Sequence, residues 1–138
     1  MNLNQDLIRT RCHEIEDSLS RLEQIQAVPK EVFLKDRDLQ DVACYRLMVA
    51  IEAALGLCYH ISAKHLKRVP EGYAECFAIL AGASVISIEL SERLQRMARF
   101  RNLLVHMYWK VDLETLYELI QNRLTDLRQF SQAIVALL

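Results

Sequence analysis

The sequence has few of the residues that interrupt regular structure, with three glycines and two prolines among 138 residues. Long, uninterrupted elements are therefore expected. The four cysteines form no Cys-x-x-Cys pair and no Cys/His spacing typical of zinc, which predicts four small buried side chains in a reducing cytosol. The formal net charge of −1 excludes a basic surface over the whole protein. A nucleic acid would therefore need a local basic patch.

Long hydrophobic runs and a secretory signal are also missing. Residues 1–20 carry charges throughout, unlike a signal peptide. Arg46, Glu52 and His60 interrupt the longest apolar stretches, so we expect no membrane span. A composition of 52% hydrophobic and 25% charged residues is that of a globular protein. The length favours a single domain, residues 1–138, in the cytoplasm.

Apolar residues recur at spacings of three and four, which is the periodicity of amphipathic helices. The pattern predicts helices over 3–27, 38–67, 73–81, from Ser84 or Ser87 to 103 or beyond, and from 113 to about 137. Asp38 and Asp112 are expected N-caps, and Gly82 is an expected C-cap. Strand-like alternation is absent from the sequence. The predicted fold is an all-α, antiparallel bundle of four or five helices.

Polar residues are concentrated in segment 101–110, among leucines and valine. Arg101 and His106 are five residues apart, which places them about 140° from each other on a regular helix. One phosphate could meet both only if the helix ends or kinks within the segment, or if two copies of the segment face each other across a dimer. Spacing alone also fits a solvated histidine and a surface arginine in an ion pair.

The pattern Arg101-Asn102, three residues, His106, one residue, Tyr108 resembles the signature of HEPN ribonucleases, in which four to six residues separate arginine from histidine. Tyr108 and the continuation through 109–112 look like the HepT branch of that superfamily. Segments 45–52 and 70–77 resemble its second helix and its middle segment. The resemblance covers most of the chain and implies a HEPN-like bundle.

The resemblance implies a metal-independent endoribonuclease toxin that uses no cofactor. Arg101 and His106 match the catalytic pair of the family. Histidine exchanges protons near neutral pH, as attack by a ribose 2′-hydroxyl requires, and a guanidinium binds the charge of a pentavalent phosphate. Asn102 is expected to orient the imidazole or to bond a phosphate oxygen. The implied partners are a second copy of the chain, a minimal nucleotidyltransferase antitoxin and RNA, with neither DNA nor membrane.

Tyr108 matches the tyrosine that the antitoxin of this family modifies with AMP. A bulky anionic adduct two residues from His106 would block RNA by its size and its charge. Tyr108 also fits an ordinary residue at the edge of the core. Trp109 is assigned to packing or to a dimer seam rather than to base stacking.

Three arginines, Arg93, Arg96 and Arg99, precede the motif at spacings of three. Such a row can bind the phosphates of an RNA backbone. The same row fits a solvated face that Glu89 and Glu92 balance.

Glu52 lies in a very apolar stretch, where an unpaired charge costs several kcal/mol. We expect Arg46 or Arg101 as its partner. An alternative function for the whole chain is a non-catalytic helical subunit that binds nucleotide or protein within a nucleotidyltransferase complex. A purely structural interaction protein is a third possibility.

Overall fold

The computed structural model describes residues 3–138, except for the side chain of Tyr108. These residues form α1 (Gln5–Gln26), α2 (Lys30–Phe33), α3 (Arg37–His60), α4 (Tyr73–Gly82), α5 (Ile88–His106), α6 (Leu113–Asn122) and α7 (Leu124–Val135). A π-helical turn, Ile61–His65, extends α3, and a 3-10 turn, Tyr108–Lys110, follows α5. Residues 3–138 contain no strand, so the all-α prediction is confirmed.

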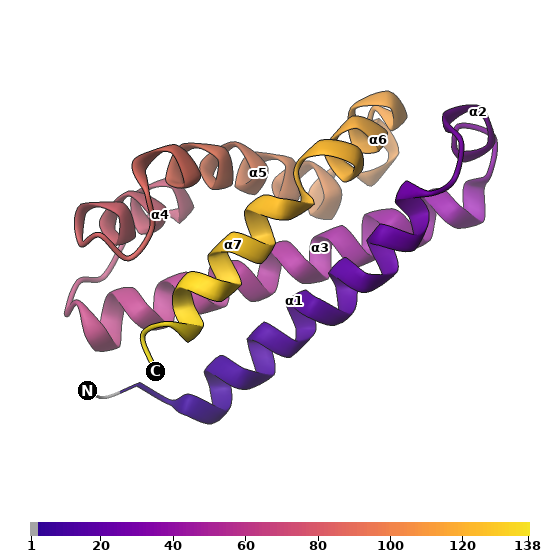
Figure 1. Cartoon of the computed structure of the whole chain (residues 1–138). Coiled ribbons are helices and arrows are strands. Elements are labelled where there is room, and N and C mark those ends of the chain that lie inside the picture. The colour runs from indigo at the N-terminus through magenta and orange to yellow at the C-terminus, as the bar shows by residue number, and fades with distance from the viewer. Residues whose placement is uncertain (1–2) are drawn as a thin grey trace.

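Helix α3 is the centre of the bundle. It lies antiparallel to α1, while α7 packs against both and α4 and α5 form a second pair on top (Figure 1). By length and composition, Arg37–His65 could cross a membrane. However, 56% of its most apolar window is buried inside the bundle, as in the core helix of a globular protein. Many of its buried side chains are small: Ala43, Cys44, Ala50, Ala53, Ala54 and Cys58.

Several helix ends differ from the prediction. The N-cap of α3 is Asp36, whose Oδ1 accepts a hydrogen bond from the backbone N–H of Leu39 at 3.1 Å. The predicted cap, Asp38, lies in the first turn instead, where a carboxylate is also stabilised by the helix dipole. The prediction of Gly82 as a C-cap is wrong as well, because Gly82 is the last residue of α4. These aspartate and glycine signals therefore locate helix ends to within one or two residues.

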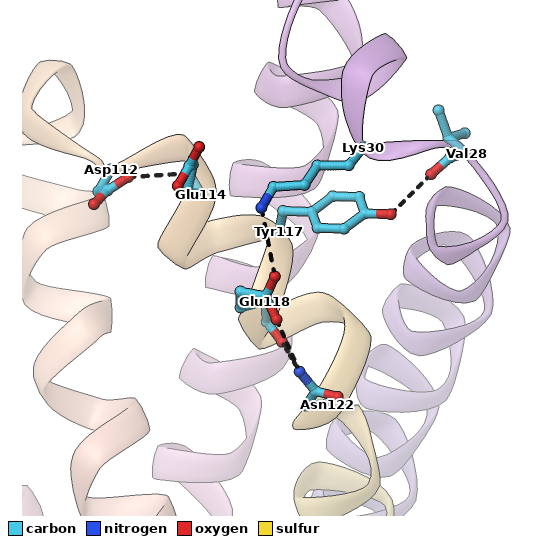
Figure 2. A network of polar contacts seen from close by, with 7 residues as sticks. All are labelled: Val28, Lys30, Asp112, Glu114, Tyr117, Glu118 and Asn122. Carbon is cyan, nitrogen blue, oxygen red and sulfur yellow. Dashed lines mark hydrogen bonds and ion pairs between the residues drawn. The ribbon is translucent and has the colours of Figure 1, made fainter.

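The predicted C-terminal helix is in fact two helices, α6 and α7, separated at Arg123. Figure 2 shows what holds α6: the Tyr117 hydroxyl donates to the backbone oxygen of Val28 at 3.2 Å, and Lys30 lies 3.8 Å from Glu118. These contacts tie α6 to the connection between α1 and α2, whereas α7 packs on α1, α3 and α5. Asp112 caps α6 as predicted.

Candidate functional site

Helix α5 carries the polar motif in its last two turns. The side chain of Ser87 caps its start, and the helix runs unbroken through Arg101 to His106. Met107 leaves the helical conformation, with φ −137° and ψ 45°. The helix therefore ends within the motif but only after His106. No bend brings Arg101 and His106 together, and the predicted offset of about 140° between them remains within one chain.

The guanidinium of Arg101 is held by three neighbouring groups. Its Nε and Nη2 both bind Oε1 of Glu52 on α3. Its Nη1 donates to Oδ1 of Asn102 at 3.0 Å. Its Cζ lies 5.4 Å from the centre of the Tyr73 ring on α4, a cation–π contact. These groups fix the arginine between three helices and leave its side chain 15% exposed.

Two N–H groups of Arg101, one on each terminal nitrogen, have no acceptor within the described part of the structure. An arginine has five N–H donors, and the bonds to Glu52 and Asn102 occupy three of them. Two donors on a fixed, planar fork can bind the oxygens of a phosphate. This arrangement can therefore hold an anion in a defined orientation.

Glu52 pairs with Arg101, which confirms one of its two predicted partners. Arg46 instead binds Asp17 of α1 at 3.1 Å. The Glu52 side chain is 42% exposed, so its charge is partly hydrated as well as paired. The apolar residues around Glu52 in the sequence suggest a fully buried position. The structure instead places Glu52 on the side of α3 that faces Arg101.

His106 is exposed at the end of α5 and has no hydrogen-bond partner among the side chains that the structure describes. The Oδ1 of Asn102, a residue expected to orient this imidazole or to bond phosphate, accepts a hydrogen bond from Arg101. The side chain of Tyr108, the predicted site of modification, lies outside the described part of the structure. Trp109 is 76% exposed and so does not pack within its own chain.

The three arginines that precede the motif have different environments. The Nε of Arg93 donates to Oδ1 of the buried Asp126 at 2.8 Å, whereas Arg96 and Arg99 are exposed. Arg96 and Arg93 line a small cavity of about 190 Å³ together with Arg123, at the break between α6 and α7. The sequence analysis missed Arg123 because it predicted one continuous helix there.

A larger polar cavity, of about 540 Å³, lies beside Arg101 between α1, α3 and α4. Glu52 and Tyr73, which hold Arg101, are also part of its wall. The other residues that line it include Arg11, Glu14, Gly56 and Tyr59. Spacing within one segment could not reveal this cavity, since three helices contribute to it.

The cysteines and the other possible metal ligands add no further chemistry. All four thiols are free and buried, as the sequence predicted. Burial, together with the nearby Asp41, raises the pKa of Cys44 to about 11. Burial and the neighbouring Cys76 raise the pKa of Cys58 further still. Within residues 3–138, no group of three or more metal-binding side chains lies close together.

Known proteins resemble this chain over nearly its whole length. A profile of the family described as "Ribonuclease HepT-like" matches residues 15–134. The mRNA nuclease HepT of Shewanella oneidensis is 28% identical over 131 residues, which are 95% of this chain and 98% of that protein.

Two solved structures share the fold. One is the tri-AMPylated HEPN toxin of Shewanella oneidensis in complex with the MNT antitoxin, with a TM-score of 0.87, 29% identity and 99% coverage of both chains. The other is a toxin–antitoxin structure with AMP-PNP, with a TM-score of 0.85, 28% identity and coverage of 97% of this chain and 99% of that one.

Proposed function

This chain belongs to the HepT-like ribonuclease family, and we propose that Arg101 and His106 are the pair with which it cleaves RNA. The protein is an endoribonuclease of a toxin–antitoxin system, like the mRNA nuclease and the HEPN toxin that it resembles. The fixed fork of Arg101 is the observation that carries the assignment of residues. Glu52, Asn102 and Tyr73 hold it, and two of its donors, which have no acceptor among the described side chains, are left for a phosphate.

The chemistry follows from these two side chains. The ribose 2′-hydroxyl gives its proton to an imidazole, and its oxygen attacks the adjacent phosphorus. The bond from phosphorus to the 5′ oxygen breaks, and that oxygen takes a proton from solvent water as it leaves. The products are a 2′,3′-cyclic phosphate and a free 5′-hydroxyl. Arg101 binds the extra negative charge of the pentavalent phosphate, and the step needs no metal ion.

The reacting pair is completed by a second copy of the chain. Because Arg101 and His106 lie on different sides of one unbroken helix, a phosphate bound to Arg101 would meet His106 of the partner subunit. Val105, Met107 and Trp109, large apolar side chains next to the motif, are exposed. Exposed apolar side chains that gather in one place are typical of interaction surfaces. We therefore place the dimer seam at the end of α5.

Control and substrate binding use neighbouring residues. A nucleotidyltransferase antitoxin attaches AMP to Tyr108, two residues from His106, and the anionic adduct excludes RNA. The related HEPN toxin is tri-AMPylated and is bound to its MNT antitoxin. The exposed Arg96 and Arg99 bind RNA phosphates, whereas Arg93 is bound to Asp126. We assign the chain, as a single HEPN domain, to the cytoplasm.

The replacement His106→Ala tests this function. Purified wild type and variant are incubated with total cellular RNA in the presence of EDTA, which inactivates contaminating metal nucleases. We expect cleavage to fall by about a hundredfold to ten-thousandfold, the usual contribution of an acid–base group. His13→Ala, at another exposed histidine, is the matched control and should cleave normally. A His106→Ala protein that still cleaves RNA would refute the assignment and favour a role in binding alone.

A further inference from the structure

The cavity of about 540 Å³ beside Arg101 has no role in the chemistry described above. We propose that it binds the base and ribose of the nucleotide that flanks the cleaved phosphate. This inference rests on the proposed function, because it takes the position of that phosphate from Arg101. The cavity then determines which nucleotide the enzyme accepts next to the scissile bond.

The cavity shares two wall residues with the surroundings of Arg101. Glu52 and Tyr73 each contact the guanidinium of Arg101 and also form part of the cavity wall. Arg101 does not itself line the cavity, but these two shared neighbours place a phosphate on its two remaining donors within one nucleotide of the cavity. The adjoining nucleoside is covalently attached to that phosphate, and the cavity is a neighbouring space large enough to take it.

The charges that line the cavity favour a nucleoside over a second phosphate. Arg11 is already neutralised, because its Nη1 binds both carboxylate oxygens of Glu14 at 3.0 and 3.2 Å. Glu52 adds a partly exposed carboxylate. Carboxylates accept hydrogen bonds, so this wall suits the N–H groups of a base and the hydroxyl groups of a ribose.

Two tyrosines form the aromatic part of the wall. The rings of Tyr59 and Tyr73 meet edge to face, with centroids 5.9 Å apart. Nucleic-acid bases stack on such rings with little dependence on their identity. Burial, followed by the nearby Cys76, raises the pKa of Tyr59. Like that of an ordinary tyrosine, its hydroxyl is protonated at neutral pH and available as a donor.

Gly56 supplies an independent observation. It is the one glycine in the interior of a helix within the described residues, and glycine there weakens a helix relative to alanine. A Cβ at Gly56 would lie 3.6 Å from Nε of Arg11, which is an ordinary contact. Packing in the free protein therefore does not require glycine. The missing side chain instead keeps the cavity open.

The test compares Gly56→Leu, which fills the cavity, with Gly56→Ala, which leaves most of it empty. Both residues favour a helix, so both variants should fold at least as well as the parent. Affinity for a short fluorescent single-stranded RNA, taken from a mapped cleavage site, is measured by anisotropy in the His106→Ala background. We expect Gly56→Leu to weaken binding about tenfold, the usual effect of losing one stacked base. Equal affinities for both variants and the parent would overturn the proposal.

A second measurement changes the RNA instead of the protein. Abasic nucleotides are placed on either side of the cleaved phosphate. At one of the two positions, the abasic nucleotide should lower the affinity of the parent protein for the RNA about tenfold. The affinity of Gly56→Leu should not fall further with the same RNA. If Gly56→Leu does not fold, the measurement on the parent protein alone decides. The proposal is refuted if neither abasic position lowers the affinity of the parent.

The two proposals fail in different ways. Cleavage by the wild type with no effect of Gly56→Leu or of abasic RNA would leave the catalytic pair and remove the cavity. If Gly56→Leu weakens RNA binding but the wild type cleaves no RNA, the cavity remains a binding site and the assignment of the catalytic pair is refuted.

Discussion

Arg93 and Arg101 are eight residues apart on α5, and each pairs with a carboxylate of another helix, but the two pairs are built in opposite ways. In the first, the Asp126 side chain is 4% exposed and Arg93 is 28% exposed. In the second, Arg101 is the covered partner at 15%, and Glu52 is 42% exposed. The carboxylate is therefore the buried partner in the first pair, and the guanidinium is the buried partner in the second.

From this difference we propose that Arg93 serves mainly the stability of the fold and that Arg101 serves the binding of substrate. Oδ2 of Asp126 is buried and has no hydrogen-bond partner among the described residues, so this carboxylate depends on Arg93 for compensation. A buried charge that loses its partner is strongly destabilising. Glu52 can be hydrated without Arg101. The surroundings of Arg101 thus orient the arginine itself, as binding of an anion requires.

The largest effect that separates the two arginines is expected from Arg101→Ala. RNA cleavage should fall by about a hundredfold to a thousandfold, the usual cost of losing one group that stabilises a transition-state anion. The free energy of unfolding should fall by only about 1 kcal/mol, from the lost packing and cation–π contact of the covered guanidinium, because Glu52 remains hydrated. Initial cleavage rates and urea denaturation provide the two measurements.

A further variant, Arg101→Lys, should recover little activity, since lysine has the charge but not the planar fork. If Arg101→Ala unfolds the protein instead, then Arg101 belongs with Arg93 as a structural residue, and the contrast between the two pairs fails.

The next largest effect is expected from Arg93→Ala, on stability. Removal of Arg93 leaves the Asp126 carboxylate buried without a partner, which should lower the free energy of unfolding by about 3 kcal/mol. The protein that remains folded should cleave RNA at nearly the normal rate. Urea denaturation measures the loss, and Arg96→Ala, an exposed arginine of the same helix, is the control.

Adding Asp126→Ala to Arg93→Ala should restore part of the lost stability, because the unpaired charge is then removed. A stable Arg93→Ala protein with weakened RNA binding would contradict this interpretation. Arg93 would then bind RNA together with Arg96 and Arg99, as the sequence predicts.

Spacing along the chain predicts the residues that one helix can present, and here it succeeded. It indicated an all-α fold, the N-cap Ser87 as one of two choices, and the motif of α5. It also gave Arg101 as one of two partners for Glu52, because a charge in a very apolar stretch requires compensation. It predicted that Arg101 and His106 would not meet on a regular helix, and α5 is unbroken between them.

Spacing does not reveal what lies across from a helix, and the errors arise there. The partner of Arg93 is 33 residues away, on α7. That helix begins after the break at Arg123, although the apolar periodicity of the sequence continues through it. The cavity beside Arg101 combines residues of three helices, and the residues from any one helix form no recognisable motif. Tertiary packing decides these features, and one sequence contains no direct signal for them.

The smallest of these effects should come from Glu52, which we assign to positioning Arg101 rather than to contact with the reacting atoms. Glu52→Ala removes the acceptor that binds Nε of Arg101. We expect kcat/KM for RNA to fall about tenfold, as for the loss of one hydrogen bond to a charged group. Glu52→Gln keeps an oxygen that accepts the same bond and should restore most of the activity.

Asp17→Ala is the matched control for Glu52→Ala. It breaks the ion pair of Arg46, which lies on α3 like Glu52 but away from the motif. This variant should cleave RNA normally, since exposed ion pairs contribute about 1 kcal/mol or less to stability. If Glu52→Gln is as inactive as Glu52→Ala, the negative charge matters more than the position of Arg101. If Asp17→Ala is equally impaired, the effect is one of general stability, and Glu52 does not have a specific role.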